Sequence, residues 1–439
     1  MREPVAFTAP LRSPSLSIGS ATLTDLKMRM LMFRSLLLAV LFAPLSTTAQ
    51  TLCTSGFAGT YPCNEVDLMA RLTPAQLGAT GSLNDCWGWT SPVTGKEYAL
   101  VGLYNGTAFV DITNPLAPVR IGNLATHTGN SSWRDIKVYN GYAYIVSEAS
   151  GHGMQVFDLA RLDAVTSPPV TFTEDGHVPT FGKAHNIVID EESAMAYAVG
   201  ANICSGGLAM FSLATPTAPV YVGCFSADGY THDAHCLVYQ GPDADYQGKR
   251  MCFCSNEDTF TIVDVDDPTD PMQVSRTGYP GSKYTHQGWL CEDHLYYFMN
   301  DELDESNLGH NTRTRVWDVS DLDVPVLLGY YDGATTAIDH NLYTHANLVY
   351  EANYRAGLRI LDVLDPATVA LQEIAYFDTY PANNNPDFNG VWSVYPYFQS
   401  GNVILSSIGE GLFVVRPRFS SRIPLRVFLQ GPYDPGSGL

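Results

Sequence analysis

The sequence predicts an all-β protein, a seven-bladed β-propeller built from four-stranded blades. A strand signature recurs along the chain at intervals of about 44 to 54 residues, which is the period of a propeller blade. The chain contains 25 Tyr and 19 Phe, which favour strands, and 37 Gly and 27 Pro, which favour turns. No amphipathic pattern of helix length interrupts the repeats, so α/β folds are disfavoured. We place the propeller at residues 50–417.

The signature consists of two hydrophobic residues, an aspartate and another hydrophobic residue at the end of a predicted strand. Its copies lie at 109–112, 156–159, 262–265, 316–319 and 360–363, with a serine variant at 210–213 and a terminal variant at 413–416. Most copies are followed by a turn that contains proline. Seven copies predict seven blades.

Each repeat unit has the same predicted order of strands. In the second unit, a first strand at 135–139 is followed by an Asn-Gly turn at 140–141 and a second strand at 142–146. A glycine-containing loop then leads to the signature strand. An outer strand follows the proline turn, as at 118–122 in the preceding unit. Four short strands separated by turns make one propeller blade.

Residues 1–49 are predicted to form an upstream segment and a signal peptide. Arg29 and Arg34 precede an apolar run at 35–43, and Pro44 and small residues follow up to Ala49. The run is too short to span a bilayer, so we expect no transmembrane helix in the mature chain. Residues 418–439 are predicted to be the start of a truncated C-terminal segment. The expected localisation is secreted or at the cell surface.

Export makes disulfide bonds possible among the nine cysteines. Three pairings are reasonable from spacing and predicted strands: Cys53–Cys63, Cys204–Cys224 and Cys236–Cys252. The odd number of cysteines leaves at least one free thiol. No Cys-x-x-Cys motif is present, which argues against redox or zinc-ribbon chemistry.

Four longer stretches of sequence are as characteristic as the signature strands. They lie at 133–138, 185–189, 284–289 and 350–359. The signature strands with their turns resemble LVIVD-repeat proteins, and these longer stretches resemble the bacterial choice-of-anchor B family. The resemblance implies a secreted or surface-displayed propeller. No catalytic residues can be carried over from these families to this sequence.

Alignment of the first strands brings Asp and His residues to one register near the start of each blade. The residues at this register are Asp85, Asp135, His185, His235, His286, His340 and, in the last unit, Val391. The innermost strands of a propeller line its central channel, so we expect these side chains to form a ring around the axis. Four of the 11 histidines lie at this register.

Carboxylates and imidazoles that face one another make a set of metal ligands. The ring therefore predicts a divalent metal, with zinc, iron, copper or calcium as candidates. Supporting groups are expected from neighbouring residues, namely Lys183, Arg134, His232, Asp233, Asn186, Gln287, Asp339 and Asn341. In the alternative interpretation, polar channel residues hold ordered water and satisfy the strand ends. A slip of one residue would turn the ring side chains into packing positions between blades.

An acidic segment at 300–305, followed by Asn307, offers oxygen atoms that can bind calcium. Its spacing is not that of an EF-hand, and we expect an exposed loop, with calcium binding as the alternative. The aspartates at 264–267 and 318–321 are expected to form turns at strand ends. His294 and His310 lie outside the ring register and are expected at the surface.

The formal net charge of −21 argues against nucleic acid as a partner, since phosphates would be repelled. Phosphate-binding loops, nucleophile elbows and His-Glu-x-x-His motifs are absent from the sequence. Our first hypothesis is therefore a binding scaffold for a protein or glycan partner at the cell surface, which can also hold a divalent metal in the channel. The alternative is a metal-dependent hydrolase or oxidoreductase that uses the ring, with His235 or Asp135 moving protons. The sequence does not decide whether the protein is an enzyme.

Overall fold

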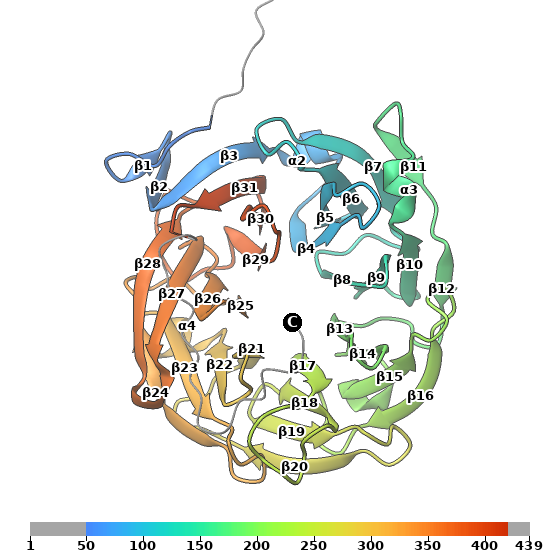
Figure 1. Ribbon diagram of the computed structural model, residues 1–439, viewed down its shortest axis with the longest axis vertical. Coiled ribbons are helices and arrows are strands. Elements are labelled where there is room, and N and C mark those ends of the chain that lie inside the picture. The colour runs from blue at the N-terminus through green and yellow to red at the C-terminus, as the bar shows by residue number, and fades with distance from the viewer. Residues whose placement is uncertain (1–49, 420–439) are drawn as a thin grey trace, which may run out of the picture. The chain divides into compact units, whose positions relative to one another are not determined.

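Seven sheets stand around one axis in the computed structural model, which describes residues 50–419 (Figure 1). The predicted all-β class, the seven blades and the four-stranded blade are confirmed. The predicted signal peptide lies outside the described residues, as does nearly all of the predicted C-terminal segment. We number the blades 1 to 7 by their innermost strands in chain order.

Each blade consists of four main strands that run outward from the channel. The innermost strands surround the centre of Figure 1 and are β4 (Leu83–Thr90), β8 (Arg134–Tyr139), β13 (Asn186–Asp190), β17 (Asp233–Val238), β21 (Thr285–Leu290), β25 (Asn341–His345) and β29 (Val391–Tyr395). The second strands are β5 (Glu97–Leu103), β9 (Tyr142–Ser147), β14 (Met195–Val199), β18 (Arg250–Ser255), β22 (Tyr296–Asp301), β26 (Leu348–Ala352) and β30 (Val403–Ser407).

The third strands carry the sequence signature, and the fourth strands form the outer edge. The third strands are β6 (Gly106–Asp111), β10 (Met154–Asp158), β15 (Leu208–Ser212), β19 (Phe260–Asp264), β23 (Arg313–Asp318), β27 (Leu358–Asp365) and β31 (Gly411–Pro417). The fourth strands are β7 (Val119–Ala125), β12 (Gly176–Val178), β16 (Val220–Phe225), β20 (Met272–Thr277), β24 (Val326–Asp332), β28 (Ala370–Phe377) and β3 (Val66–Leu72).

The signature aspartates of blades 4 and 5 end their third strands by closing a turn. In blade 4, Asp264 Oδ1 accepts a hydrogen bond from the backbone N–H of Asp266, at 3.0 Å. In blade 5, Asp318 Oδ1 accepts from the N–H of Ser320 in the same way, at 2.9 Å. A short carboxylate side chain favours this turn because it can reach the backbone two residues on. The predicted role of these aspartates is confirmed.

Several short additional elements accompany the four main strands of the blades. In blade 2, α3 (Ala160–Asp163) and β11 (Val170–Phe172) lie in the chain between the third strand β10 and the outer strand β12. The strand β11 does not join blade 2 but pairs in parallel with β7 of blade 1. Two strands, β1 (Phe57–Ala58) and β2 (Tyr61–Asn64), extend blade 6. The remaining short helical elements are α2 (Pro74–Leu77), α4 (Asp304–Leu308), η1 (Cys204–Gly206) and η2 (Pro366–Thr368).

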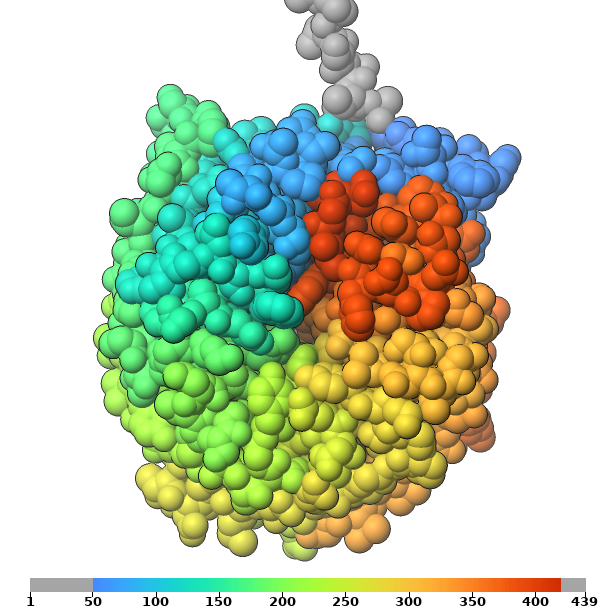
Figure 2. All heavy atoms as spheres, turned by 180° about the vertical axis from the view of Figure 1, so that it is seen from behind, coloured from blue at the N-terminus to red at the C-terminus, as the bar shows by residue number. Residues whose placement is uncertain are grey.

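Blade 7 is assembled from both ends of the described chain. Its first three strands are β29, β30 and β31, and its outer strand is β3 from the N-terminal side, with Val66 opposite Pro417. Figure 2 shows the N-terminal atoms in blue beside the C-terminal atoms in red on one face. This pairing closes the ring, and the repeat pattern alone did not predict it.

The hydrophobic core lies between neighbouring blades. Phe109 of blade 1 stacks on Phe157 of blade 2 at a ring-centroid distance of 4.5 Å, and Phe172 packs edge-on against Phe157 at 5.0 Å. Both faces of most second and third strands are buried, which explains why these strands read as nearly continuous apolar runs. Aromatic pairs of this kind add to the free energy gained by apolar burial.

All three predicted disulfides are present: Cys53–Cys63, Cys204–Cys224 and Cys236–Cys252. The last pair joins directly opposed residues of β17 and β18. Three thiols remain free, those of Cys86, Cys254 and Cys291. No helix within residues 50–419 is long and apolar enough to cross a membrane.

Candidate metal centre

Four histidines lie side by side around the channel, one from each of blades 3 to 6. The ring centroids of His185 and His232 are 4.3 Å apart, those of His232 and His286 are 4.1 Å apart, and those of His286 and His340 are 4.5 Å apart. Each residue stands at the start of an innermost strand or immediately before it. We call this set the histidine arc.

Bonds between blades fix three of these imidazoles. The Nδ1 atom of His232 lies 2.9 Å from the carbonyl oxygen of His286, and Nδ1 of His286 lies 3.0 Å from that of His340. Nδ1 of His340 contacts the carbonyl oxygen of Trp392 at 2.5 Å. Because a carbonyl only accepts hydrogen bonds, Nδ1 must carry the proton, and Nε2 keeps its lone pair. Metal-binding histidines in proteins are oriented by the same kind of backbone hydrogen bond.

A carboxylate lies between two members of the arc. Glu302 Oε1 is 3.8 Å from Nε2 of His286 and 3.7 Å from Nε2 of His340, and it accepts a hydrogen bond from the hydroxyl of Tyr354 at 2.7 Å. One ligand atom each from His286, Glu302 and His340 lie within 4.8 Å of one another. Two imidazole nitrogens and a carboxylate oxygen are a donor set that suits zinc, iron or copper.

The other end of the arc also ends at a carboxylate. His185 Nδ1 lies 2.6 Å from Glu148 Oε1. Glu148 comes from the segment that follows β9, whereas Glu302 follows β22, so the two carboxylates belong to blades 2 and 5.

Burial keeps three members of the arc neutral. Together with a smaller effect of other histidines of the arc, it lowers the pKa of His286 and of His340 to about 3. Burial also lowers the pKa of His232 well below its ordinary value. A metal ion binds imidazole only in its deprotonated form, so no proton has to be displaced from these three rings at neutral pH.

The structure corrects the predicted ring, because the six predicted residues do not share one register. Asp85 Oδ2 accepts from the N–H of Ile136 at 3.0 Å, and Asp135 Oδ2 accepts from the N–H of Ile187 at 2.8 Å. Lys137 Nζ lies 2.9 Å from Asp135 and 3.6 Å from Asp85. Burial raises the pKa of Asp85, whereas Lys137 and hydrogen bonds outweigh burial and lower the pKa of Asp135. These aspartates form a buried ion-pair network.

His235 also departs from the predicted ring. It lies two residues inside β17, where its ring stacks on Trp289 at 3.7 Å and its Nδ1 accepts from the N–H of Leu290 at 3.2 Å. The arc position of blade 4 is held by His232. The sequence contains a signal that identifies His232, because the tripeptide Tyr-Thr-His at 230–232 recurs at 284–286, where it ends in the arc residue His286.

A small pocket adjoins the ion-pair network. Its walls include Trp87, Lys137, Asp233, Trp289 and Tyr343. The ammonium group of Lys137 lies 4.7 Å from the ring centroid of Trp87, a cation–π contact. The channel therefore has two chemically different regions, one of neutral imidazoles and one of aromatic and charged groups.

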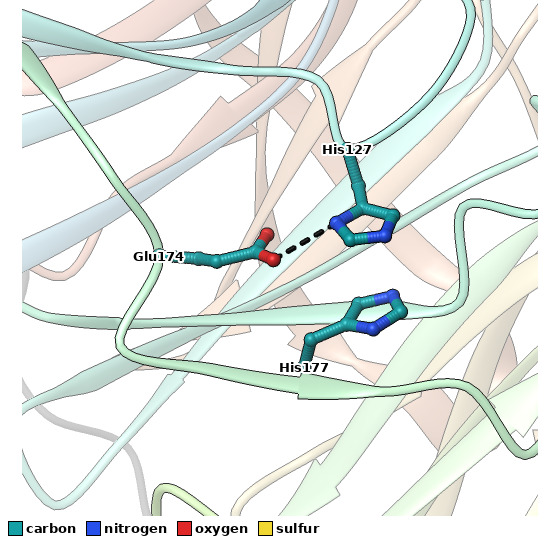
Figure 3. A group of neighbouring side chains, drawn as sticks. All are labelled: His127, Glu174 and His177. Carbon is teal, nitrogen blue, oxygen red and sulfur yellow. Dashed lines mark hydrogen bonds and ion pairs between the residues drawn. The ribbon is translucent and has the colours of Figure 1, made fainter.

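A second group of potential ligands lies at the outer part of blade 2. Figure 3 shows Glu174 directed at the ring of His127, with His177 stacked beneath that ring. The two ring centroids are 3.6 Å apart with an interplanar angle of 12°, and Glu174 Oε1 is 2.8 Å from His127 Nδ1. Gln155 donates to the other oxygen of Glu174 at 2.7 Å. Parallel stacked rings do not aim their lone pairs at one point, so this group is a satisfied polar cluster.

The acidic segment after β22 is not the exposed loop that its composition suggested. Asp301, Asp304 and Glu305 are buried, and only residues 306–309 are exposed. His294 and His310, expected at the surface, are partly buried.

Comparison with known proteins supports the repeat and the fold. The LVIVD repeat family matches residues 131–151. No curated protein matches this sequence. The β-propeller domain of Cps50 (Swd1) from Myceliophteria thermophila is similar with 11% identity, over 73% of this chain and 93% of that chain, at a TM-score of 0.47. Hydrazine synthase from Kuenenia stuttgartiensis is similar with 12% identity, over 75% of this chain and 94% of that chain, at a TM-score of 0.50. The similarity to hydrazine synthase concerns the fold alone.

Proposed function

We propose that this chain is an exported binding scaffold of the LVIVD-repeat type, related to the choice-of-anchor B family, that holds a divalent transition metal in its channel. The proposed ligands are drawn from His185, His232, His286 and His340, with Glu302 as ligand or as partner of a bound water. The observation that carries the proposal is the histidine arc, in which three imidazoles donate through Nδ1 to a backbone carbonyl, so that their Nε2 atoms are left unprotonated.

Three features support the scaffold and its export. The propeller presents many loops on a rigid frame, the chain carries an LVIVD repeat, and three disulfides suit an oxidising compartment. A protein or glycan partner at the cell surface is the partner class that we propose.

Elemental analysis of the purified chain tests the metal. We expect stoichiometric zinc, iron or copper in the wild type and its loss in the double variant His286→Ala, His340→Ala. The matched control is His127→Ala, His177→Ala, which removes the stacked cluster of blade 2 and should leave the metal content unchanged. A wild type that remains metal-free after incubation with each ion would refute the proposal.

A metal-dependent hydrolase or oxidoreductase is the second candidate function, and the position of Glu302 favours it. Its Oε1 faces two arc nitrogens and is held by the hydroxyl of Tyr354, so it can accept a proton at this site. This candidate requires turnover that is lost in Glu302→Gln even at metal concentrations that saturate the variant.

A further inference from the structure

Three buried carboxylates converge between blades 5 and 6, away from the histidine arc. Asp304 and Glu305 belong to α4, and Asp339 belongs to the segment that precedes β25. One oxygen from each lies within 4.8 Å of the other two. The exposed fractions of the three residues are 0%, 1% and 2%.

Most oxygens of this group have no hydrogen-bond partner within residues 50–419. Both oxygens of Glu305, both oxygens of Asp339 and Oδ1 of Asp304 are unpartnered. The remaining oxygen, Oδ2 of Asp304, is bound by the guanidinium of Arg315. Asp339 reaches the group from a different blade than α4, so its unpartnered carboxylate is an independent sign of a missing ligand. A buried carboxylate without a partner is strongly disfavoured.

Among the other acidic residues within 50–419, the only buried side-chain oxygen without a partner is Oδ1 of Asp85. Asp301 is equally buried, but it accepts from the hydroxyl of Tyr279 and from the N–H groups of Lys283 and Tyr284. A second carboxylate triad gathers within the same distance, but its oxygens already accept hydrogen bonds. It consists of Asp243, Asp321 and Asp323.

The charge of the group favours a cation. When ionised, the three carboxylates and Arg315 sum to −2, and the neighbouring Asp301 adds a negative charge. His310, whose Nε2 is 3.6 Å from Asp304 Oδ2, adds a positive charge only when it is protonated. The free donors are all oxygens, and two carboxylates can each bind through both atoms. Calcium accepts six to eight oxygen ligands in irregular geometry, whereas magnesium requires a near-ideal octahedron and retains several waters. The burial of the group leaves little room for such waters.

We propose that Asp304, Glu305 and Asp339 bind one calcium ion that links blade 5 to blade 6. The proposal does not rest on the metal proposed for the channel. The ion would fix two segments that carry channel groups, because Glu302 lies two residues before Asp304 and His340 directly follows Asp339.

Thermal unfolding of the purified chain after treatment with a chelator tests the proposal. Calcium at about 100 times its dissociation constant should raise the Tm by about 3 °C. Magnesium at the same concentration should raise it by less than half as much. Terbium should bind the wild type with luminescence sensitised by the buried aromatic residues, and calcium should displace it. An equal response to magnesium, or no response to calcium and terbium, would overturn the proposal.

Two double variants locate the ion. Glu305→Gln, Asp339→Asn should abolish the calcium shift, whereas the control Asp321→Asn, Asp323→Asn should keep it. If the first variant does not fold, Asp339→Asn alone should weaken the displacement of terbium by calcium at least tenfold. A calcium shift that survives in the first variant and disappears in the control would assign the ion to the exposed triad and refute the proposed site.

Discussion

His286 donates a hydrogen bond through Nδ1 to the backbone carbonyl oxygen of His340, the residue at the matching position of the next blade. The ring of one arc member is thus oriented by the backbone that carries the following one. His232 makes the same bond to the carbonyl of His286. The tautomer of each ring is therefore set by the packing of two blades and does not require a metal.

Removal of Lys137 should be among the most harmful single changes in the channel. Lys137→Met leaves Asp85 and Asp135 buried without a cation, and breaking a buried pair in this way costs about 3–5 kcal/mol. The control is Lys96→Met, because Lys96 pairs with Asp111 at 3.3 Å with 41% of its side chain exposed. That change should cost no more than about 1 kcal/mol. Urea denaturation measures both, and equal losses would contradict the assignment of Lys137.

The stability of the metal-free protein should depend on the arc when the pH falls. His286 has a folded pKa of about 3, below its ordinary value of about 6.5, so it stays neutral in the native state and is protonated on unfolding. Its contribution to stability is present above pH about 6.5 and is lost as the pH falls below that value. The difference in unfolding free energy between the wild type and His286→Gln should therefore shrink by about 2 kcal/mol from pH 7.5 to pH 5. A constant difference over this range would show that folding does not lower the pKa of His286.

Metal affinity should depend on Glu302. Glu302→Gln removes the charge beside His286 and His340 and should weaken metal binding by at least about 10- to 100-fold. Tyr354→Phe removes only the hydroxyl that donates to Glu302 and should weaken binding less. Competition with a chromophoric chelator measures both affinities. An unchanged affinity in Glu302→Gln would place the metal elsewhere.

Packing between blades should dominate stability. Phe109→Ala removes a fully buried ring that stacks on Phe157 of the next blade, and such a deletion costs about 3–5 kcal/mol. Val93 is 86% exposed, and Val93→Ala should change the free energy of unfolding by no more than about 0.5 kcal/mol. Chemical denaturation of the two variants is the measurement, and similar losses would argue against a core between the blades.

The fold was predictable because its repeating feature is local. In blades 1 to 5 the side chain of the signature Asp or Ser accepts a hydrogen bond from the N–H two residues on, as Asp264 does, so the signature marks the same strand end in these blades. The closing strand β3 was not predictable in this way. As an outer strand it carries no signature, and its partner β31 lies at the other end of the described chain.

The arc was predicted only in part, because the blades differ in length. His185 and His232 are 47 residues apart, whereas His232 and His286, and likewise His286 and His340, are 54 residues apart. Counting about fifty residues per blade therefore placed Asp85 and His286 at one register, although Asp85 is equivalent to the adjacent Gln287. Glu302 and Tyr354 come from outside the innermost strands, where no periodicity marks them.

The pairing of β3 with β31 has a consequence for the order in which the molecule matures. A polypeptide that emerges N-terminus first presents Val66–Leu72 long before its hydrogen-bonding partner Gly411–Pro417 has appeared. Once the six earlier blades have been made, they would form an open crescent with two uncovered edges until blade 7 is completed. Premature termination anywhere before residue 411 would leave the crescent permanently open and prone to join another copy edge to edge.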